Sequence, residues 1–164
     1  MLFRSIDGDA ILFEKFAEGA TDHGRAVSDL VAQALAKNPA PHQVVVGMGP
    51  GPFTGLRVGI AFARTFALAR EIPVIGVCSL DAIVIDQDSY TVAIDARRKE
   101  IYWARYHDGV RVEGPAVNKP DEVSGYILGN FPSAQRLVEL SRTQSVSEPF
   151  YLRRPDAVPT AERS

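Results

Sequence analysis

The most distinctive residues of the sequence form a glycine-rich segment, GMGPGPFTGLRVG, at residues 47–59. It follows a β-branched run and precedes an apolar helical pattern, so a glycine loop would lie at a helix N-terminus. Backbone N–H groups at such a place can bind an anion. The candidate residues of this loop are Gly49, Gly51, Thr54, Gly55 and Arg57.

The familiar phosphate-binding motifs do not fit this segment. A P-loop needs Lys and then Ser or Thr after its last glycine, but Leu56 and Arg57 follow Gly55. The spacing G-x-G-x-x-G of dinucleotide sites is also missing. Two interpretations stay open: an anion site, or a tight connection whose glycines let the helix pack closely on the sheet.

The spacing of the histidines predicts no metal site. His23 lies just before a helical pattern, but position 27, one turn on, is Val27, and neither His42 nor His107 has ligand spacing. We therefore expect no metal ligand and no cofactor. His23 is interpreted as a partly exposed residue at a helix start.

Two other places were considered for catalysis. Asp95 precedes a cationic run at 97–99, so it is either an acid at a phosphate or metal site or, as we favour, a turn residue paired with these cations. Cys78 and Ser79 have no histidine nearby in sequence that would activate a nucleophile. We expect no catalytic residue in this chain.

The elements that would position these residues follow from periodicity and turn signals. The dipeptide Asp7-Gly8 is typical of a hairpin turn, and helical spacing predicts two longer helices. The predicted strands are 2–6, 10–16, 43–48, 73–77, 91–95, 100–107, 110–113 and 126–128, and the predicted helices are 25–37, 56–70 and 134–140, with a helical turn at 80–85.

These elements form a loose repeat, in which a strand meander precedes alternating helix and strand. The first copy has two meander strands and the second has three. The predicted division is an N-terminal lobe at 1–88, a shortened C-terminal lobe at 89–147 and a tail at 148–164, whose last eight or so residues are expected to be disordered.

The predicted helix at 56–70 is apolar on nearly every face, which is typical of a helix buried on both sides. One stripe carries small residues that would allow another helix to approach closely, and the adjoining stripe carries bulky residues suited to the sheet. The small stripe is Gly59, Ala63 and Ala67, and the bulky stripe is Val58, Phe62 and Phe66. The small stripe faces either a partner or the helix at 25–37. We assign it to the partner, because the bulky stripe is better suited to filling the core that faces the sheet.

Composition limits the classes of function. Eighteen Lys and Arg against twenty Asp and Glu give a net charge of -2, so the chain is not expected to bind nucleic acid alone. The single cysteine excludes an intramolecular disulfide, and the N-terminal residues lack the apolar region of a signal peptide. No apolar stretch is long enough to cross a bilayer, and we expect a cytoplasmic protein.

Four blocks resemble the TsaB family, also called YeaZ, in the order found there. They are the segment at 47–59, IPVIGVCSLDA at 72–82, AIDARRKEIYWARY at 93–106 and EPFYLRRPDA at 148–157. The resemblance runs from about Leu2 to Ala157. It implies an α/β fold of duplicated actin/hexokinase-like (RNase H-like) lobes, with mixed sheets and flanking helices.

The resemblance also implies a role. TsaB proteins are non-catalytic partners of TsaD, and with the ATPase TsaE the assembly transfers a threonylcarbamoyl group from its adenylate to the adenosine 3′ of the anticodon in tRNA. The implied partners are thus a TsaD-like catalytic subunit and a TsaE-like ATPase, with tRNA bound only through the complex. The H-x-x-x-H pair of TsaD is not matched at His23 and Val27, as expected for an accessory subunit.

In the family, pairing with TsaD or with a second TsaB uses two helices of the N-terminal lobe, which match 25–37 and 56–70. Such helices from both partners would form a four-helix packing, and a homodimer would use the same surface. The implied partner-binding residues are Val27, Leu30, Val31, Ala34, Gly59, Ala63 and Ala67.

The sequence departs from the family in three places. Many members have serine where Pro52 stands, the usual opening strand has no counterpart before Leu2, and the region 125–140 is short. We therefore expect an N-terminal lobe without its first strand and a shortened C-terminal lobe. The alternative function is an ATP-binding protein of the same fold with its own phosphotransfer or hydrolase activity. A metalloprotease would need metal ligands that the sequence does not show.

Overall fold

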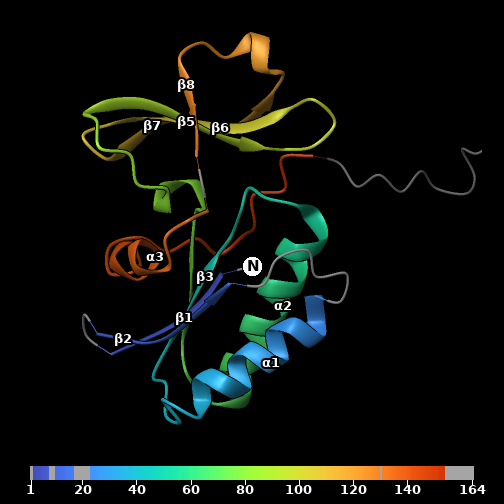
Figure 1. Cartoon of the computed structure of the whole chain (residues 1–164), viewed down its shortest axis with the longest axis vertical. Coiled ribbons are helices and arrows are strands. Elements are labelled where there is room, and N and C mark those ends of the chain that lie inside the picture. Colours follow the sequence, from blue (N-terminus) through green and yellow to red (C-terminus); the bar gives the residue numbers. More distant parts are fainter. Residues whose placement is uncertain (1, 8–9, 17–22, 130, 154–164) are drawn as a thin grey trace, which may run out of the picture.

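A computed structural model describes residues 2–7, 10–16, 23–129 and 131–153 of the chain. The molecule is elongated, with a four-stranded sheet at one end and two longer helices with the other strands at the opposite end (Figure 1). None of the described helices has the length and apolar character needed to span a membrane. The tail predicted to be disordered lies outside the described residues.

The lower part of the molecule contains two separate two-stranded sheets. β1 (Leu2–Asp7) pairs with β2 (Ala10–Phe16) in the predicted antiparallel sense. β3 (Val44–Gly47) pairs with β4 (Val74–Val77) in parallel, and β3 is half-buried where a buried strand was expected. Within the described part of the chain, no strand joins β1 to β3. Of the predicted turn dipeptide, Gly8 is not among the described residues.

Two helices cover one face of these strands. α1 (His23–Leu35) packs on β1 and β2, whereas α2 (Phe53–Ala69) packs on β3 and β4, and the two helices contact each other. α1 begins two residues and α2 three residues before the predicted starts. Both helices hold their contacts through one buried stripe of apolar side chains, as an amphipathic surface helix does.

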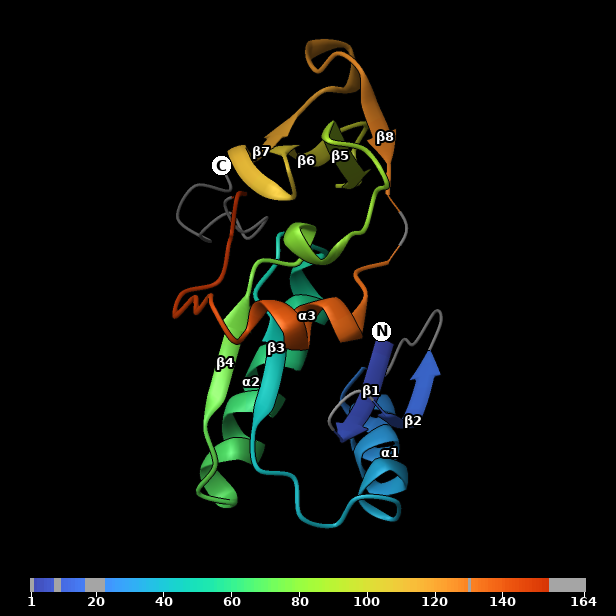
Figure 2. The same cartoon turned by 90° about the vertical axis from the view of Figure 1, so that its left-hand side faces the viewer.

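The third helix, α3 (Ala134–Leu140), has the predicted bounds and lies on the opposite face of the strands (Figure 2). Ser133 caps it, because its Oγ accepts a hydrogen bond of 3.3 Å from the N–H of Arg136. α3 packs against β1, β3 and the short 3₁₀ turn η1 (Leu80–Ala82). The lobe boundaries at 88 and 147 stay a prediction, and α3, which falls in the second lobe by that division, lies on strands of the first.

The upper sheet has the order β7-β6-β5-β8. β5 (Ser89–Asp95), β6 (Ile101–His107) and β7 (Val110–Asn118) form the predicted antiparallel meander, and β8 (Tyr126–Leu128) runs parallel to β5. β7 is five residues longer than predicted. Its pairing with β6 continues to Asn118, beyond an irregularity opposite Arg105.

Both faces of the upper sheet are covered, so its strands alternate between two small cores. Val92, Ala104 and Tyr106 pack with Cys78, Leu80 and Ile83 on the face toward the rest of the molecule. On the other face, the residues Ala93, Ile101 and Trp103 pack with Val123, which follows the turn η2 (Pro120–Glu122). Because both faces of the sheet are covered, Val92 and Ala93, which are adjacent in β5 and point to opposite faces, are both fully buried.

A buried carboxylate joins the upper sheet to the strands below. Asp81 lies in η1, and its side chain is only 7% exposed. Its Oδ1 accepts hydrogen bonds of 2.9 Å from the hydroxyl of Tyr106 in β6 and of 2.9 Å from Nε of Arg111 in β7. Burial, together with the negative charge of Asp81, raises the pKa of Tyr106. Burial lowers the pKa of Arg111, but the hydrogen bond and charge of Asp81 outweigh this effect and raise it.

The Asp81 network gives a test of what holds the two parts together. Replacing Asp81 by Asn removes the charge that Arg111 and Tyr106 share and should lower the free energy of unfolding by about 2–4 kcal/mol. The control is Glu113→Gln, which removes the exposed ion pair with Arg105 and should cost less than about 1 kcal/mol. Urea unfolding measures both variants, and equal losses would contradict a central role for Asp81.

Candidate functional site

The glycine-rich loop joins β3 to α2 and is largely used for internal packing. Gly49 has φ 85°, and a Cβ there would lie 2.7 Å from Cδ2 of Leu56. The N–H of Gly49 donates to Oγ of Ser79 at 3.0 Å, and the N–H of Ser79 donates to the carbonyl of Gly49 at 2.7 Å. Glycine is therefore required here by backbone conformation and close packing.

These contacts decide part of the open question about the loop. Met48, Gly49 and Pro50 are buried, and the amide of Gly49 is already bonded within the chain. The tight-connection interpretation is therefore confirmed at Gly49. Anion binding stays a prediction for the other candidate residues, of which Thr54 and Arg57 are exposed and Gly51 and Gly55 half-exposed.

The predicted partner-binding residues lie mostly inside the chain. Six of the seven are 2% to 7% exposed, while Gly59 is half-buried; the six are Val27, Leu30, Val31, Ala34, Ala63 and Ala67. The expectation that Ala63 and Ala67 point outward and the bulky stripe inward is therefore wrong. Small side chains face the interior because α1 and the strands approach α2 closely there. Whether these residues bind a partner stays a prediction.

The outer face of α2 carries both apolar and polar side chains. Leu68 is 80% exposed, and Ala61 and Ala69 are exposed as well, together with Arg57, Arg64 and Thr65. Phe62 and Phe66 are half-buried and stack on each other, with ring centroids 6.0 Å apart. Leu68 is thus a large apolar side chain left uncovered on a helix that also buries its opposite side.

The other sequence candidates are not brought together into one site. α1 starts at His23, whose side chain is outside the description, and both His42 and His107 are exposed. Asp95 is a turn residue, as favoured, because its Oδ1 accepts the N–H of Arg97 at 2.7 Å. In the described ranges, no group of three or more His, Cys, Asp or Glu side chains is placed to hold a metal ion.

Cys78 and Ser79 have structural surroundings. Cys78 is fully buried, and burial raises the pKa of its thiol to about 11, with the nearby charge of Asp81 adding to the shift. A thiol with so high a pKa is a poor nucleophile at neutral pH. Ser79 precedes η1, but its hydroxyl is bonded to the glycine loop and does not cap the turn.

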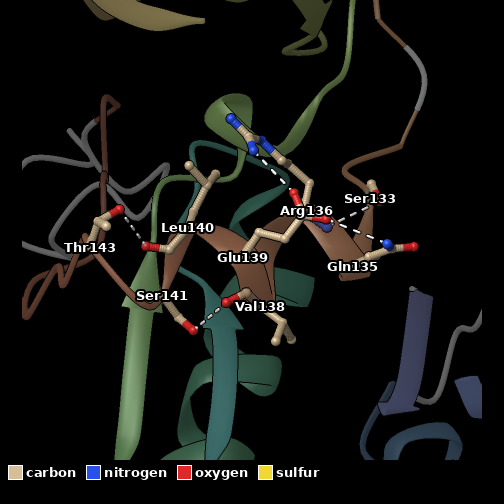
Figure 3. A network of polar contacts seen from close by, with 8 residues as sticks. All are labelled: Ser133, Gln135, Arg136, Val138, Glu139, Leu140, Ser141 and Thr143. Atoms are coloured by element: carbon tan, nitrogen blue, oxygen red, sulfur yellow. Dashed lines mark hydrogen bonds and ion pairs between the residues drawn. The ribbon is translucent and has the colours of Figure 1, made fainter. Parts of the chain in front are cut away.

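An open pocket of about 420 Å³ lies between η1, β5 and α3. Three polar side chains of α3 line this pocket, Gln135, Arg136 and Glu139, and they bond to one another (Figure 3). Arg136 pairs with Glu139 at 3.0 Å, and Gln135 donates to the same carboxylate at 3.4 Å. Because these charges compensate each other locally, the pocket offers no concentrated charge of one sign to a ligand.

Sequence reasoning missed the segment 146–153, which runs from α3 past the N-terminal end of α2 toward the upper sheet (Figure 1). The N–H of Val146 donates to the carbonyl of Gly76 at 2.8 Å, and that of Phe150 to the carbonyl of Met48 at 2.8 Å. Tyr151 packs on Phe53 with ring centroids 5.5 Å apart. The motif EPFYLRRPDA was noted only as part of a resemblance, and its residues have no periodicity that would predict these contacts.

Comparison with protein families places these features in context. Residues 17–157 match the family described as TsaD, tRNA N6-adenosine threonylcarbamoyltransferase. An uncharacterized protein of Mycobacterium tuberculosis is 40% identical over 178 residues, which cover 92% of this chain and 84% of that protein. Another, of Mycobacterium leprae, is 46% identical over 140 residues, which cover 71% of this chain and 39% of that protein.

A shorter match links the chain to a characterized relative. The tRNA threonylcarbamoyladenosine biosynthesis protein TsaB of Escherichia coli is 41% identical over 90 residues, or 47% of this chain and 38% of that protein. The chain thus spans less than two thirds of the length of this relative and of the Mycobacterium leprae protein.

The fold has solved counterparts. YeaZ from Pseudomonas aeruginosa superposes with a TM-score of 0.73 at 22% identity, covering 90% of this chain and 92% of that chain. A second Pseudomonas aeruginosa structure, described as similar to peptidase YEAZ, gives 0.72 at 21% identity. From the family match, the chain belongs to the TsaD family of proteins, and it is similar to the relatives named TsaB and YeaZ.

Proposed function

We propose that this chain is an accessory subunit in the biosynthesis of threonylcarbamoyladenosine in tRNA, paired with a TsaD-like catalytic subunit. The similar proteins of Escherichia coli and Bacillus subtilis both carry the name tRNA threonylcarbamoyladenosine biosynthesis protein TsaB. The proposal places the chain in the cytoplasm with tRNA. A TsaE-like ATPase joins the assembly, and tRNA is bound through the complex.

The uncovered outer face of α2 is the observation that carries this proposal. A helix that buries Ile60, Ala63 and Ala67 on one side needs no further apolar residues for its own fold. Yet Leu68 and Ala61 remain exposed on the other side, beside the half-buried Phe62–Phe66 stack. Apolar surface of this kind gains free energy when a partner covers it.

The surroundings of the glycine loop favour a supporting role over the alternative of an ATP-dependent enzyme. The loop's first turn is fixed by Ser79 and Leu56, so the amide of Gly49 is not directed at a ligand. Cys78 is buried with a high thiol pKa. The chemistry of the reaction is assigned to the partner, and a homodimer of this chain would use the same face of α2 in its absence.

A pair of variants on α2 separates the partner face from the interior. Ala61→Glu puts a carboxylate on the exposed face, so the isolated chain should change in stability by less than about 0.5 kcal/mol. In the complex the same carboxylate would be desolvated against the partner, and the exposed Arg57 and Arg64, four and three residues away, would offset only part of the cost. A net cost of several kcal/mol is about enough to abolish a micromolar complex. Pull-down of the TsaD-like protein and thermal unfolding measure the two effects.

The matched control is Ala63→Glu, two residues further along the helix. Ala63 is 6% exposed, and a buried glutamate there should unfold the isolated chain. If Ala61→Glu keeps both fold and partner, pairing uses another surface. If Ala61→Glu unfolds the chain as Ala63→Glu does, the side chain of residue 61 faces the interior and the proposed partner face of α2 is wrong.

The pathway is tested in cells that depend on this chain. Its depletion should lower the threonylcarbamoyladenosine content of tRNA, measured by mass spectrometry of nucleosides, and the wild-type chain should restore it. Ala61→Glu should fail to restore it, although the variant remains folded. Unchanged modification after complete depletion would contradict the proposed pathway.

A further inference from the structure

The turn between β5 and β6 has an unusual backbone. Arg97, Arg98 and Lys99 have φ angles of 63°, 56° and 61°, and all three side chains are exposed. Residues other than glycine rarely adopt this left-handed region, and three in succession carry a conformational cost. Such strain persists only where neighbouring contacts hold it, and it is concentrated at functional places.

The neighbouring contacts of this turn are well defined. The carboxylate of Asp95 accepts the N–H of Arg97, and the N–H of Glu100 donates to the carbonyl of Arg97 at 3.1 Å. Arg153 donates to that same carbonyl at 3.1 Å and pairs with the carboxylate of Glu100. The turn is therefore held from both sides, with three consecutive cationic side chains extending from it.

An exposed aromatic pair is connected to this turn through Arg153. Phe53 and Tyr151 are 39% and 45% exposed, and Arg57 lies over the ring of Phe53 at 5.1 Å from its centroid. Tyr151 packs on Phe53, and Arg153, two residues further along the chain, reaches the carbonyl of Arg97 with its side chain. We name the six exposed residues that this connection links the cationic–aromatic surface: Phe53, Arg57, Arg97, Arg98, Lys99 and Tyr151.

This surface concentrates positive charge in a chain whose net charge is -2. Glu100 is paired by Arg153. The ion pair of Arg97 with Asp95 spans 3.5 Å between side chains that are 79% and 65% exposed. Exposed pairs of this kind are weak, so they compete poorly with a polyanion that offers several phosphates.

We propose that the cationic–aromatic surface binds RNA at an unpaired loop, with phosphates at the cations of the turn and an unstacked base on Tyr151 and Phe53. Base stacking on aromatic rings beside arginines is the usual mode of single-stranded recognition, whereas an RNA duplex hides its base faces. An acidic protein would use the cations but would leave the aromatic pair without a role. This proposal rests on the proposed role in tRNA modification. It differs from the expectation that the chain reaches tRNA only through the complex, because it gives this chain an RNA-binding surface of its own.

The test measures binding of the full chain to a fluorescent RNA stem-loop by anisotropy, between about 50 and 200 mM salt. Arg98→Asn/Lys99→Asn removes two cations, and asparagine tolerates the left-handed backbone. This variant should bind about tenfold more weakly and flatten the logarithmic salt dependence by about 1.4, since each phosphate contact on a single strand contributes about 0.7. Tyr151→Leu should weaken stem-loop binding about tenfold and leave binding to the blunt duplex of the same stem unchanged.

The control is Arg25→Asn/Lys37→Asn, which removes two exposed cations, one in the first turn of α1 and one two residues after its end. Helix α1 lies away from the upper sheet (Figure 1). This control removes the same charge and should change the affinity less than about twofold if the site is local. Equal losses for both double variants would overturn the proposal. So would an acidic peptide that binds as tightly as the stem-loop and is unaffected by Tyr151→Leu, since this identifies a protein-binding surface.

Cellular modification separates this inference from the proposed function. If the wild-type chain restores threonylcarbamoyladenosine and Arg98→Asn/Lys99→Asn restores it equally well, the RNA surface is wrong while the pathway stands. If the wild-type chain restores nothing, the pathway is wrong, and the anisotropy series alone then decides whether the surface binds RNA.

Discussion

Burial of the Asp81 carboxylate constrains how the two parts of the molecule meet. A charge removed from water needs nearby donors, and here they come from Tyr106 and Arg111 on two strands of the upper sheet. The donors fix the position of that sheet relative to η1 and therefore to β4, which directly precedes it. The pKa values of Cys78 and Tyr106 are both raised, first by burial of these side chains themselves and then by the nearby charge of Asp81.

The packing of α2 follows from this arrangement of strands and helices. With β3, β4 and α1 all close to it, the helix buries Ile60 and the two small residues Ala63 and Ala67 on its inner stripe. Phe62 and Phe66 are only half-buried, and Leu68 is exposed. The sequence pattern suggested a helix buried on both sides, whereas the described chain buries one side of it.

The sequence predicted most elements because their signals are local. The bounds of β2, β8 and α3 were correct, and the three-stranded meander formed as expected. The orientation of α2 could not be predicted, since an apolar pattern on all faces carries no information on which face turns inward. The Asp81 network and the left-handed turn at 97–99 also lacked signals, because they depend on residues distant in sequence or on backbone angles unusual for arginine and lysine.

The segment 146–153 has a consequence for how the chain reaches its final structure. Arg64 donates to the carbonyl of Ser147 across 83 positions of sequence, and Phe150 and Arg153 likewise contact residues far upstream. Closing such long loops is entropically costly and slow compared with forming a hairpin or a helix. The helices and the β5–β7 meander can form early. We expect the contacts of segment 146–153, which connect α2 to the upper sheet, to form last. The surface at Tyr151 thus exists only in a fully folded molecule, which makes it a marker of completed folding.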